Sequence, residues 1–161
     1  MMKKVLLFFL ILITLIINKN MIFAVEDAGQ SIGEEKRVEL KKDVNSLLNK
    51  RSNLWNQLFS PKSNLVDINK ELKEIVEEPL LTYDMEAFSE IKNKHTSMER
   101  ILKVDVLDIS NIRINEKEII IDIKVEWLME GFEENYKEKL DYRMNLIKKD
   151  EKWKICDYKV I

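Results

Sequence analysis

The sequence predicts an α+β domain, with N-terminal helices packed on a curved antiparallel sheet, and three observations support this class. Apolar residues recur at three- and four-residue spacing between Leu40 and Ile91, which is typical of amphipathic helices. From Leu102 onward they alternate with polar residues, as in half-buried strands. The 161 residues are 45% apolar and 35% charged, with three glycines and two prolines, which excludes collagen-like, low-complexity and disordered chains.

Three helices are expected before the sheet. The first is long, and Ser60-Pro61 ends it because proline cannot continue the helical hydrogen bonds. Asp67 is the predicted N-cap of the second helix, which ends at Pro79, and Asp84 is the predicted N-cap of the third. Arg51 interrupts the apolar stripe of the first helix, so we expect it to reach the edge of the core or to pair with a carboxylate across the helix–sheet boundary.

Strands are expected after the helices, at residues 102–114, 118–129, 135–147 and from Trp153 onward. Short polar turns separate them, which predicts an antiparallel meander with one face packed and the other wet. The alternation slips after Val106, which predicts a β-bulge in the first strand. We expect the core between helix and sheet to bring together Leu54, Trp127, Trp153 and Ile155.

Residues 1–24 have the parts of a secretory signal: two lysines near the start, an apolar run over residues 5–17, and Ala24 at the predicted cleavage position. The run is interrupted only by Thr14, and it is shorter than the roughly 20 residues that a membrane-spanning helix needs. We therefore expect export with cleavage near Ala24 or, alternatively, an uncleaved N-terminal anchor. Both place the body outside the cytoplasmic membrane.

The rest of the chain is expected to form a polar linker over residues 25–37 and one domain over residues 38–161. Without the three lysines of the first segment, 24 basic residues stand against 29 acidic ones, so the body lacks the positive charge that nucleic acids and anionic membranes attract. Membrane contact is expected only through an uncleaved first segment. The single His95 and single Cys156 predict no metal site, and without a glycine-rich phosphate loop no cofactor is expected.

Three helices followed by long antiparallel strands resemble the nuclear transport factor 2-like (cystatin-like) superfamily, in its extracytoplasmic bacterial branch. The likeness is carried by the strand Glu118–Met129 with its tryptophan, the Gly131 loop, the strand Asn135–Ile147, and the closing residues Trp153–Tyr158. It implies a conical fold in which Trp153 packs under the helices. Because this superfamily contains both enzymes and silent binding modules, the likeness implies no single function.

A weaker likeness covers Leu48–Pro61 and the later Glu126–Gly131. These segments are similar to the region that precedes amidase domains in secreted proteins of clostridia. The likeness implies a cell-envelope setting, whereas amidase activity is not carried over to these residues.

Enzymes of the superfamily use inward-facing Asp, His or Tyr side chains as a base or as oxyanion donors. The inward positions of the strand Glu118–Met129 are apolar, and the next strand offers Tyr136 and Tyr142. Asp157 shares its alternation with Ile155, which makes it the one candidate catalytic carboxylate; the alternative is that strand twist turns it to water.

The conical fold implied by the resemblance has an open mouth between helices and sheet. This mouth is the candidate binding site for a ligand or partner, with a predicted lining of Trp55, Phe59, Tyr83 and Phe88. The alternative is that these side chains belong to the core. The sequence favours a non-catalytic extracytoplasmic binding module of the bacterial cell envelope, whose partner is an envelope protein or an apolar small ligand. Two alternatives stay open: an isomerase- or dehydratase-type enzyme using Asp157 or a tyrosine, and an inhibitor or immunity-type partner protein.

Overall fold

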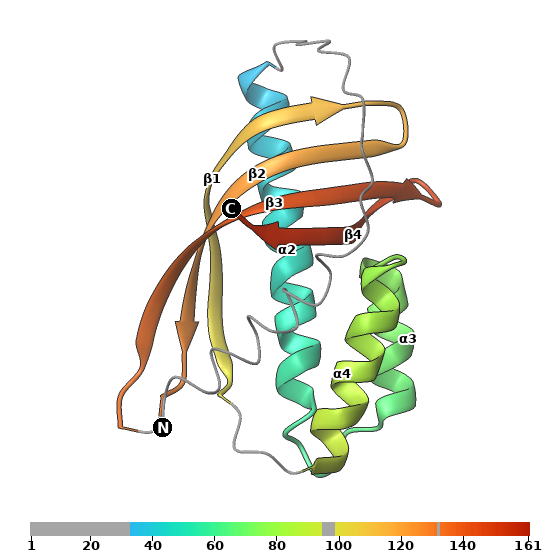
Figure 1. Ribbon diagram of the computed structural model, residues 1–161, viewed down its shortest axis with the longest axis vertical. Helices are drawn as coiled ribbons and strands as arrows, with labels where there is room; N and C mark the ends of the chain where they lie inside the picture. The colour runs from blue at the N-terminus through green and yellow to red at the C-terminus, as the bar shows by residue number, and fades with distance from the viewer. Residues whose placement is uncertain (1–32, 95–98, 132) are drawn as a thin grey trace.

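The computed structural model describes residues 33–94, 99–131 and 133–161. Within these ranges three helices precede a four-stranded antiparallel sheet of order β1-β2-β3-β4, so the predicted α+β class is confirmed (Figure 1). The elements are α2 (Glu34–Gln57), α3 (Leu65–Ile75), α4 (Leu80–Lys94), β1 (Ile101–Ile114), β2 (Glu118–Met129), β3 (Tyr136–Lys149) and β4 (Lys152–Val160). None of the helices in these ranges is long and apolar enough to cross a membrane. The predicted signal segment lies outside the described residues.

The first two helices begin earlier than predicted. α2 starts at Glu34, so the helix begins inside the linker that was predicted to extend to residue 37. Asn64, and not Asp67, is the N-cap of α3: its side chain accepts a hydrogen bond from the Val66 backbone N–H at 2.9 Å. Asp67 lies in the first turn, where its negative charge suits the helix dipole.

The end of α3 is set by the sheet and not by Pro79. Val76 adopts an extended backbone and forms a parallel bridge with Ile155 of β4. The Glu77 backbone N–H then donates to the Ile155 carbonyl oxygen at 2.9 Å. α4 has already begun when the chain reaches Asp84, so the predicted N-cap role of Asp84 was wrong.

Strand pairing confirms the predicted bulge and moves one predicted core residue to the surface. The β1–β2 register shifts between Val106 and Asp108, where the sequence alternation slips. A further shift between Ile101 and Lys103 turns Leu102 outward, so its side chain is 45% exposed while Ile101 takes the core position. The inward residues of β2 are buried as predicted, at Ile119, Ile121, Ile123, Val125 and Trp127.

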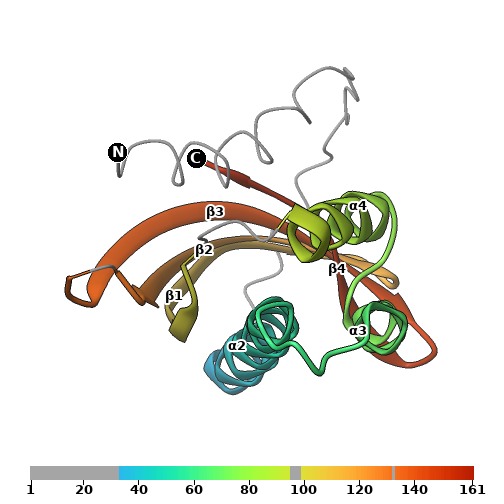
Figure 2. The same cartoon turned by 90° about the horizontal axis from the view of Figure 1, so that it is seen from below.

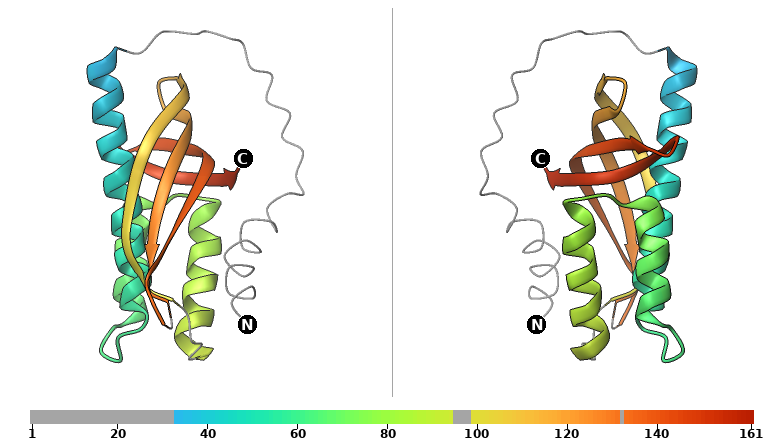
Figure 3. Two further views of the ribbon diagram at one scale, coloured as in Figure 1. Left: turned by 90° about the vertical axis from the view of Figure 1, so that its left-hand side faces the viewer. Right: turned by 90° about the vertical axis from the view of Figure 1, so that its right-hand side faces the viewer.

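The sheet is strongly bent, and the helices lie on its concave side. In Figure 1 the strands run above α3 and α4 and then, in β1 to β3, turn downward beside the helices. Figure 2, which shows the helices nearly end-on, presents this bend as an arc with α2 beneath it. Figure 3 shows α4 directly below β4, in agreement with the contacts of α3 and α4 with that strand. The inward faces of sheet and helices therefore share one core.

The free backbone edge of β1 is covered by polar side chains of α2. These side chains recur mostly every fourth residue, so they form one stripe along the helix. The hydrogen bonds run from Arg37 to Ile109 O, Lys41 to Leu107 O, Val106 N to Asn45, Asn49 to Val104 O, and Asn56 to both backbone groups of Ile101. The stripe satisfies groups that an edge strand otherwise exposes to other chains.

The predicted turns are present. Asn115 closes the β1–β2 turn by accepting from the backbone N–H groups of Lys117 and Glu118. Asp150 and Glu151 join β3 to β4 with φ of 49° and 60°, the left-handed backbone that a two-residue hairpin requires. In the loop after β2, a Cβ at Gly131 would collide with the Glu134 carbonyl oxygen.

Candidate functional site on the concave face

The predicted mouth residues do not line an opening in the described structure. Trp55 and Phe88 are 7% and 2% exposed and pack edge-to-face, with ring centroids 5.9 Å apart. Phe59 packs on the other side of Trp55 at 6.1 Å. Tyr83 is 39% exposed and stays outside this cluster. The three packed rings are therefore core residues, and the alternative that the sequence left open is the correct one for them.

Asp157 is turned to the face opposite the helices by a β-bulge. Leu146 pairs with Ile155 and Asn145 with Asp157, so Cys156 is the extra residue that reverses the alternation of β4. Asp157 is half-buried, and its carboxylate accepts from the backbone N–H of the following residue at 2.8 Å. Burial raises its pKa above the ordinary value, but it does not face the concave side, so the inward placement predicted from the alternation is wrong.

The same bulge brings Tyr158 to the concave side, where it completes a buried polar group. Arg51 of α2 binds Asp84 of α4 with two hydrogen bonds: its Nε donates to one carboxylate oxygen at 2.7 Å and its Nη2 to the other at 2.5 Å. The Arg51 guanidinium lies 5.4 Å from the centre of the Tyr158 ring. We call Arg51, Asp84 and Tyr158 the inner cluster. The expected carboxylate partner of Arg51 thus comes from another helix and not from the helix–sheet boundary.

The inner cluster is buried, and its charges neutralise one another. Arg51 is 7% exposed and Asp84 is fully buried. Burial alone lowers the pKa of Arg51, but the Asp84 carboxylate and Tyr158 hold it above the ordinary value, so the guanidinium stays charged. Burial raises the pKa of Tyr158 against the opposing effect of Arg51, so its hydroxyl stays neutral. These three groups satisfy one another and leave no free base.

A second polar group lies on the concave side at the lower ends of the strands in Figure 1. Tyr136 and Glu138 begin β3 on the inward face, and the Tyr136 hydroxyl donates a short hydrogen bond to the Glu99 carboxylate, just before β1. Burial, and then the Glu99 charge, raise the pKa of Glu138 above its ordinary value. Burial and the bond to Glu99 raise the pKa of Tyr136. We call Glu99, Tyr136 and Glu138 the acidic cluster.

Trp127 and Tyr142 connect the two clusters. Trp127 lies directly across from Glu138 in the β2–β3 register, and its ring is 6.4 Å from that of Tyr142. Tyr142 in turn packs 5.6 Å from Tyr158 of the inner cluster. Burial raises the pKa of the Tyr142 hydroxyl, and the Glu138 charge adds to this effect. A continuous strip of polar and aromatic groups thus crosses the concave face.

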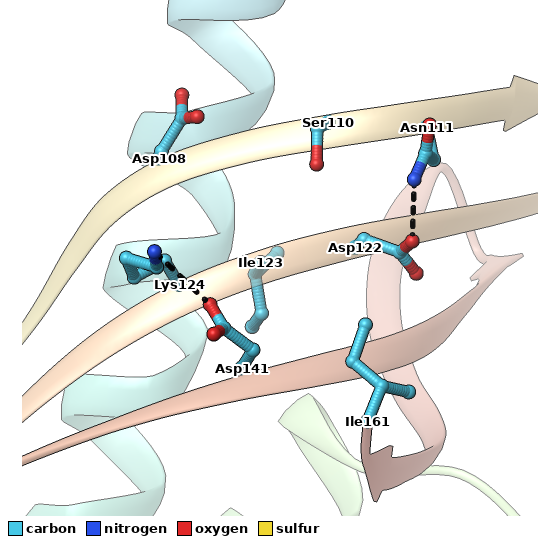
Figure 4. A pocket seen from close by; sticks show the side chains of 8 residues that line it. All are labelled: Asp108, Ser110, Asn111, Asp122, Ile123, Lys124, Asp141 and Ile161. Carbon is cyan, nitrogen blue, oxygen red and sulfur yellow. Dashed lines mark hydrogen bonds and ion pairs between the residues drawn. The ribbon is translucent and has the colours of Figure 1, made fainter.

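A pocket of about 390 Å³ lies on the opposite face of the sheet (Figure 4). Its floor is Asp122, which is buried because Arg143 binds it with two hydrogen bonds and Asn111 with a third. Lys124 pairs across the pocket with Asp141 at 3.7 Å. The pocket is lined by Asp108, Ser110, Asn111, Asp122, Ile123, Lys124, Asp141 and Ile161. Its charges are balanced by one another and by Arg37, which pairs with Asp108.

The remaining reactive side chains do not form a site in the described ranges. The half-buried Cys156 has its pKa raised to about 11 by burial and by Asp157, so its thiol is protonated near neutral pH. In the described part of the chain, no group of three His, Cys, Asp or Glu residues is placed to hold a metal ion. His95 lies outside the described residues.

Glu99, Glu138 and Tyr158 of this strip were missed by reasoning from sequence. Glu138 sits at an even position of β3, on the same face as Tyr136 and Tyr142, so alternation alone was enough to place it inward. Tyr158 carried no such signal, because one bulged residue changes its face. The partner of Arg51 also depended on which turn of α4 faces α2.

Replacing Glu138 by glutamine is expected to stabilise the protein at neutral pH. Because the pKa of Glu138 is raised on folding, the folded state keeps a proton over a pH range in which the unfolded chain has lost it. The stability that Glu138 contributes is therefore fully present at low pH. It is lost as the pH rises through the raised pKa of Glu138 in the folded state. Denaturant titrations between about pH 4 and 8 should show that the free energy of unfolding of Glu138→Gln increases relative to that of the wild type as the pH rises. Glu134→Gln, in the exposed loop nearby, is the matched control, and a Glu138→Gln protein less stable than wild type at neutral pH contradicts the expectation.

No family model matches the chain, and no curated protein matches it. Among solved structures it is similar to the intermembrane space region of the chloroplast protein ARC6, with 12% identity and a TM-score of 0.53 over 75% of this chain and 95% of that chain. A de novo designed β-sheet protein matches 77% of this chain and 88% of that chain, with 12% identity and a TM-score of 0.32. Only the first likeness is close enough to bear on the fold. It concerns the fold alone.

Proposed function

We propose that this protein is a non-catalytic, extracytoplasmic binding module of the bacterial cell envelope, built on a nuclear transport factor 2-like fold. The first 24 residues support the location, because they have the parts of a secretory signal. Helices placed on the concave side of a bent antiparallel meander support the superfamily resemblance. The binding residues are those of the acidic cluster, with Trp127 and Tyr142 beside it.

The arrangement of charges on the concave side carries the proposal. The strong donor on that side, Arg51, is neutralised by Asp84 inside the core, so it is not available to stabilise a developing negative charge. In contrast, Glu99 and Glu138 have no Lys or Arg partner among the described residues. An unbalanced pair of carboxylates is better suited to hold a partner than to perform acid–base chemistry with its neighbours. The partner we propose is polar, in place of the apolar ligand expected from the sequence.

An isomerase- or dehydratase-type enzyme is the second candidate, and one observation favours it. Glu138 is a half-buried carboxyl with a raised pKa, next to the neutral hydroxyl of Tyr142, which is the kind of environment that tunes a general base. In this alternative Glu138 takes the role that the sequence assigned to Asp157.

The test uses the exported chain, purified from outside the cytoplasm, and isolated envelope material. Intact-mass analysis is expected to show a chain beginning near Val25, and a soluble cytosolic pool retaining Met1 would contradict the proposed location. The chain should bind envelope material saturably, and the bound envelope components should be chemically unchanged after they are released. Glu138→Gln should weaken this binding and Glu134→Gln should not. Turnover of any envelope component, detected as a mass change and lost in Glu138→Gln, would favour the enzyme.

A further inference from the structure

We infer that the acidic cluster and Trp127 form a binding site for a ligand that carries a primary ammonium group next to a hydrogen-bond acceptor. Glu99 and Glu138 would hold the ammonium group, and the Trp127 indole N–H would donate to the acceptor. This inference names the ligand class of the site in the proposed function and rests on it.

The first reason is that two half-buried carboxylates of this cluster lie close enough to repel each other, and no Lys or Arg among the described residues pairs with them. Two half-buried carboxylates elsewhere in the described chain, Glu118 and Asp157, accept hydrogen bonds from neutral N–H groups. Several others are matched by cations: Asp84 by Arg51, Asp122 by Arg143, Glu126 by Lys137 and Lys139, and Glu77 by Lys149. Glu99 instead accepts from a neutral phenol, and the strongest charge acting on Glu138 is the like charge of Glu99. Half-burying two carboxylates without a cation is unfavourable, and a bound cation removes that cost.

The second reason is an unused donor beside the carboxylates. Trp127 is 7% exposed, and its indole N–H reaches no acceptor with hydrogen-bond geometry in the described structure. Trp127 lies directly across from Glu138 in the β2–β3 register, and its ring packs edge-to-face with that of Tyr142 at 6.4 Å. The orphaned donor is therefore placed among the same groups, and buried donors without an acceptor are rare in folded proteins. An acceptor atom on the ligand would accept a hydrogen bond from the Trp127 indole N–H.

The chemistry of these groups excludes the other common ligand classes. An anion would meet two carboxylates and is repelled. A bare metal ion would find two carboxylates but no third acidic or imidazole ligand in the described ranges. An ammonium group offers N–H donors to both carboxylates, and the Trp127 and Tyr142 rings give such a cation an aromatic border. A short amine with a neighbouring oxygen matches all of these groups.

The test follows the Trp127 indole signal by NMR in the exported, ¹⁵N-labelled chain at constant ionic strength. The chain has three tryptophans, and Trp127→Phe identifies the signal. Ethanolamine is the first probe and N-acetylethanolamine is its uncharged counterpart. Nα-acetyl-lysinamide is the second probe, because it presents the amine as a peptide side chain does. For ligands this small we expect dissociation constants of about 1–10 mM.

Ethanolamine or the lysine derivative should shift the Trp127 signal saturably, and the tighter of the two identifies a small amine or a peptide side chain as the source. N-acetylethanolamine should bind at least about tenfold more weakly, as should ethanolamine to Glu138→Gln, because each change removes a charged hydrogen bond. Glu134→Gln should bind as the wild type does. The inference is overturned if neither amine shifts the signal, or if Glu138→Gln binds as well as the wild type. In that case, saturable binding to envelope material would still stand as independent support for the proposed function.

Discussion

Replacing Asp84 by alanine is expected to destabilise the protein by about 3–5 kcal/mol, because it leaves the Arg51 guanidinium buried without a counter-charge. Arg51 is 7% exposed and donates two hydrogen bonds to Asp84, and no other carboxylate among the described residues pairs with it. A loss of this size is a large part of the 5–15 kcal/mol that a typical domain has in total. Urea titrations of wild type and variant measure it.

Two further variants separate the ion pair from a general effect on α4. Glu86→Ala changes an exposed carboxylate on the same helix and should cost well under 1 kcal/mol. Replacing both partners, Arg51→Met with Asp84→Leu, should recover most of the loss, because no charge is then left in the core. If Asp84→Ala costs less than about 1 kcal/mol, the pair is open to water and the inner cluster is not closed.

Replacing Ile155 by alanine is expected to cost about 2–5 kcal/mol, the usual loss for a large aliphatic side chain removed from a packed core. Ile155 is fully buried, pairs with Leu146 on one side and is bridged by Val76 on the other. Truncating Trp153 to alanine should cost less, about 1–2 kcal/mol, since this larger side chain is only partly buried. Thermal or urea unfolding of both variants gives the order directly.

This order distinguishes the structure from the expectation based on sequence, which placed Trp153 in the core beside Trp127. Trp153 pairs with Lys148 near the β3–β4 turn, whereas Trp127 pairs with Glu138 near the other end of β3. The two rings therefore cannot pack together. A Trp153→Ala variant less stable than Ile155→Ala would show that the end of the sheet is packed more tightly against the helices than it is here.

The secondary structure was largely predictable because it depends on local patterns. The inward residues of β2 alternate without interruption, and a period of two places them on one face whatever they pack against. The bulge after Val106 was visible as a slip in that alternation. The cap of α3 was missed, although Asn64 is as good an N-cap residue as Asp67, because both precede an apolar stripe.

The candidate site was only partly predictable, for two reasons. Glu138 is placed by alternation, yet its charge made it look like a solvent-facing residue among the lysines of β3. Asp157 and Tyr158 exchange faces because of the single extra residue at Cys156, and a bulge of this kind depends on pairing with β3. Asp157 therefore faces away from the concave side, as in the alternative stated for it, and not inward.

By itself, the sequence determined the α+β class, the order of the elements and most of the residues that face the core, since each follows from the period of apolar residues along a short stretch of chain. Only the tertiary structure decided that α2 covers the edge of β1, that Arg51 meets Asp84, and that Glu99 and Glu138 are left together without a cation. Each of these joins residues more than 30 positions apart. Such pairs are set by how the bent sheet closes around the helices, and no local pattern carries that information.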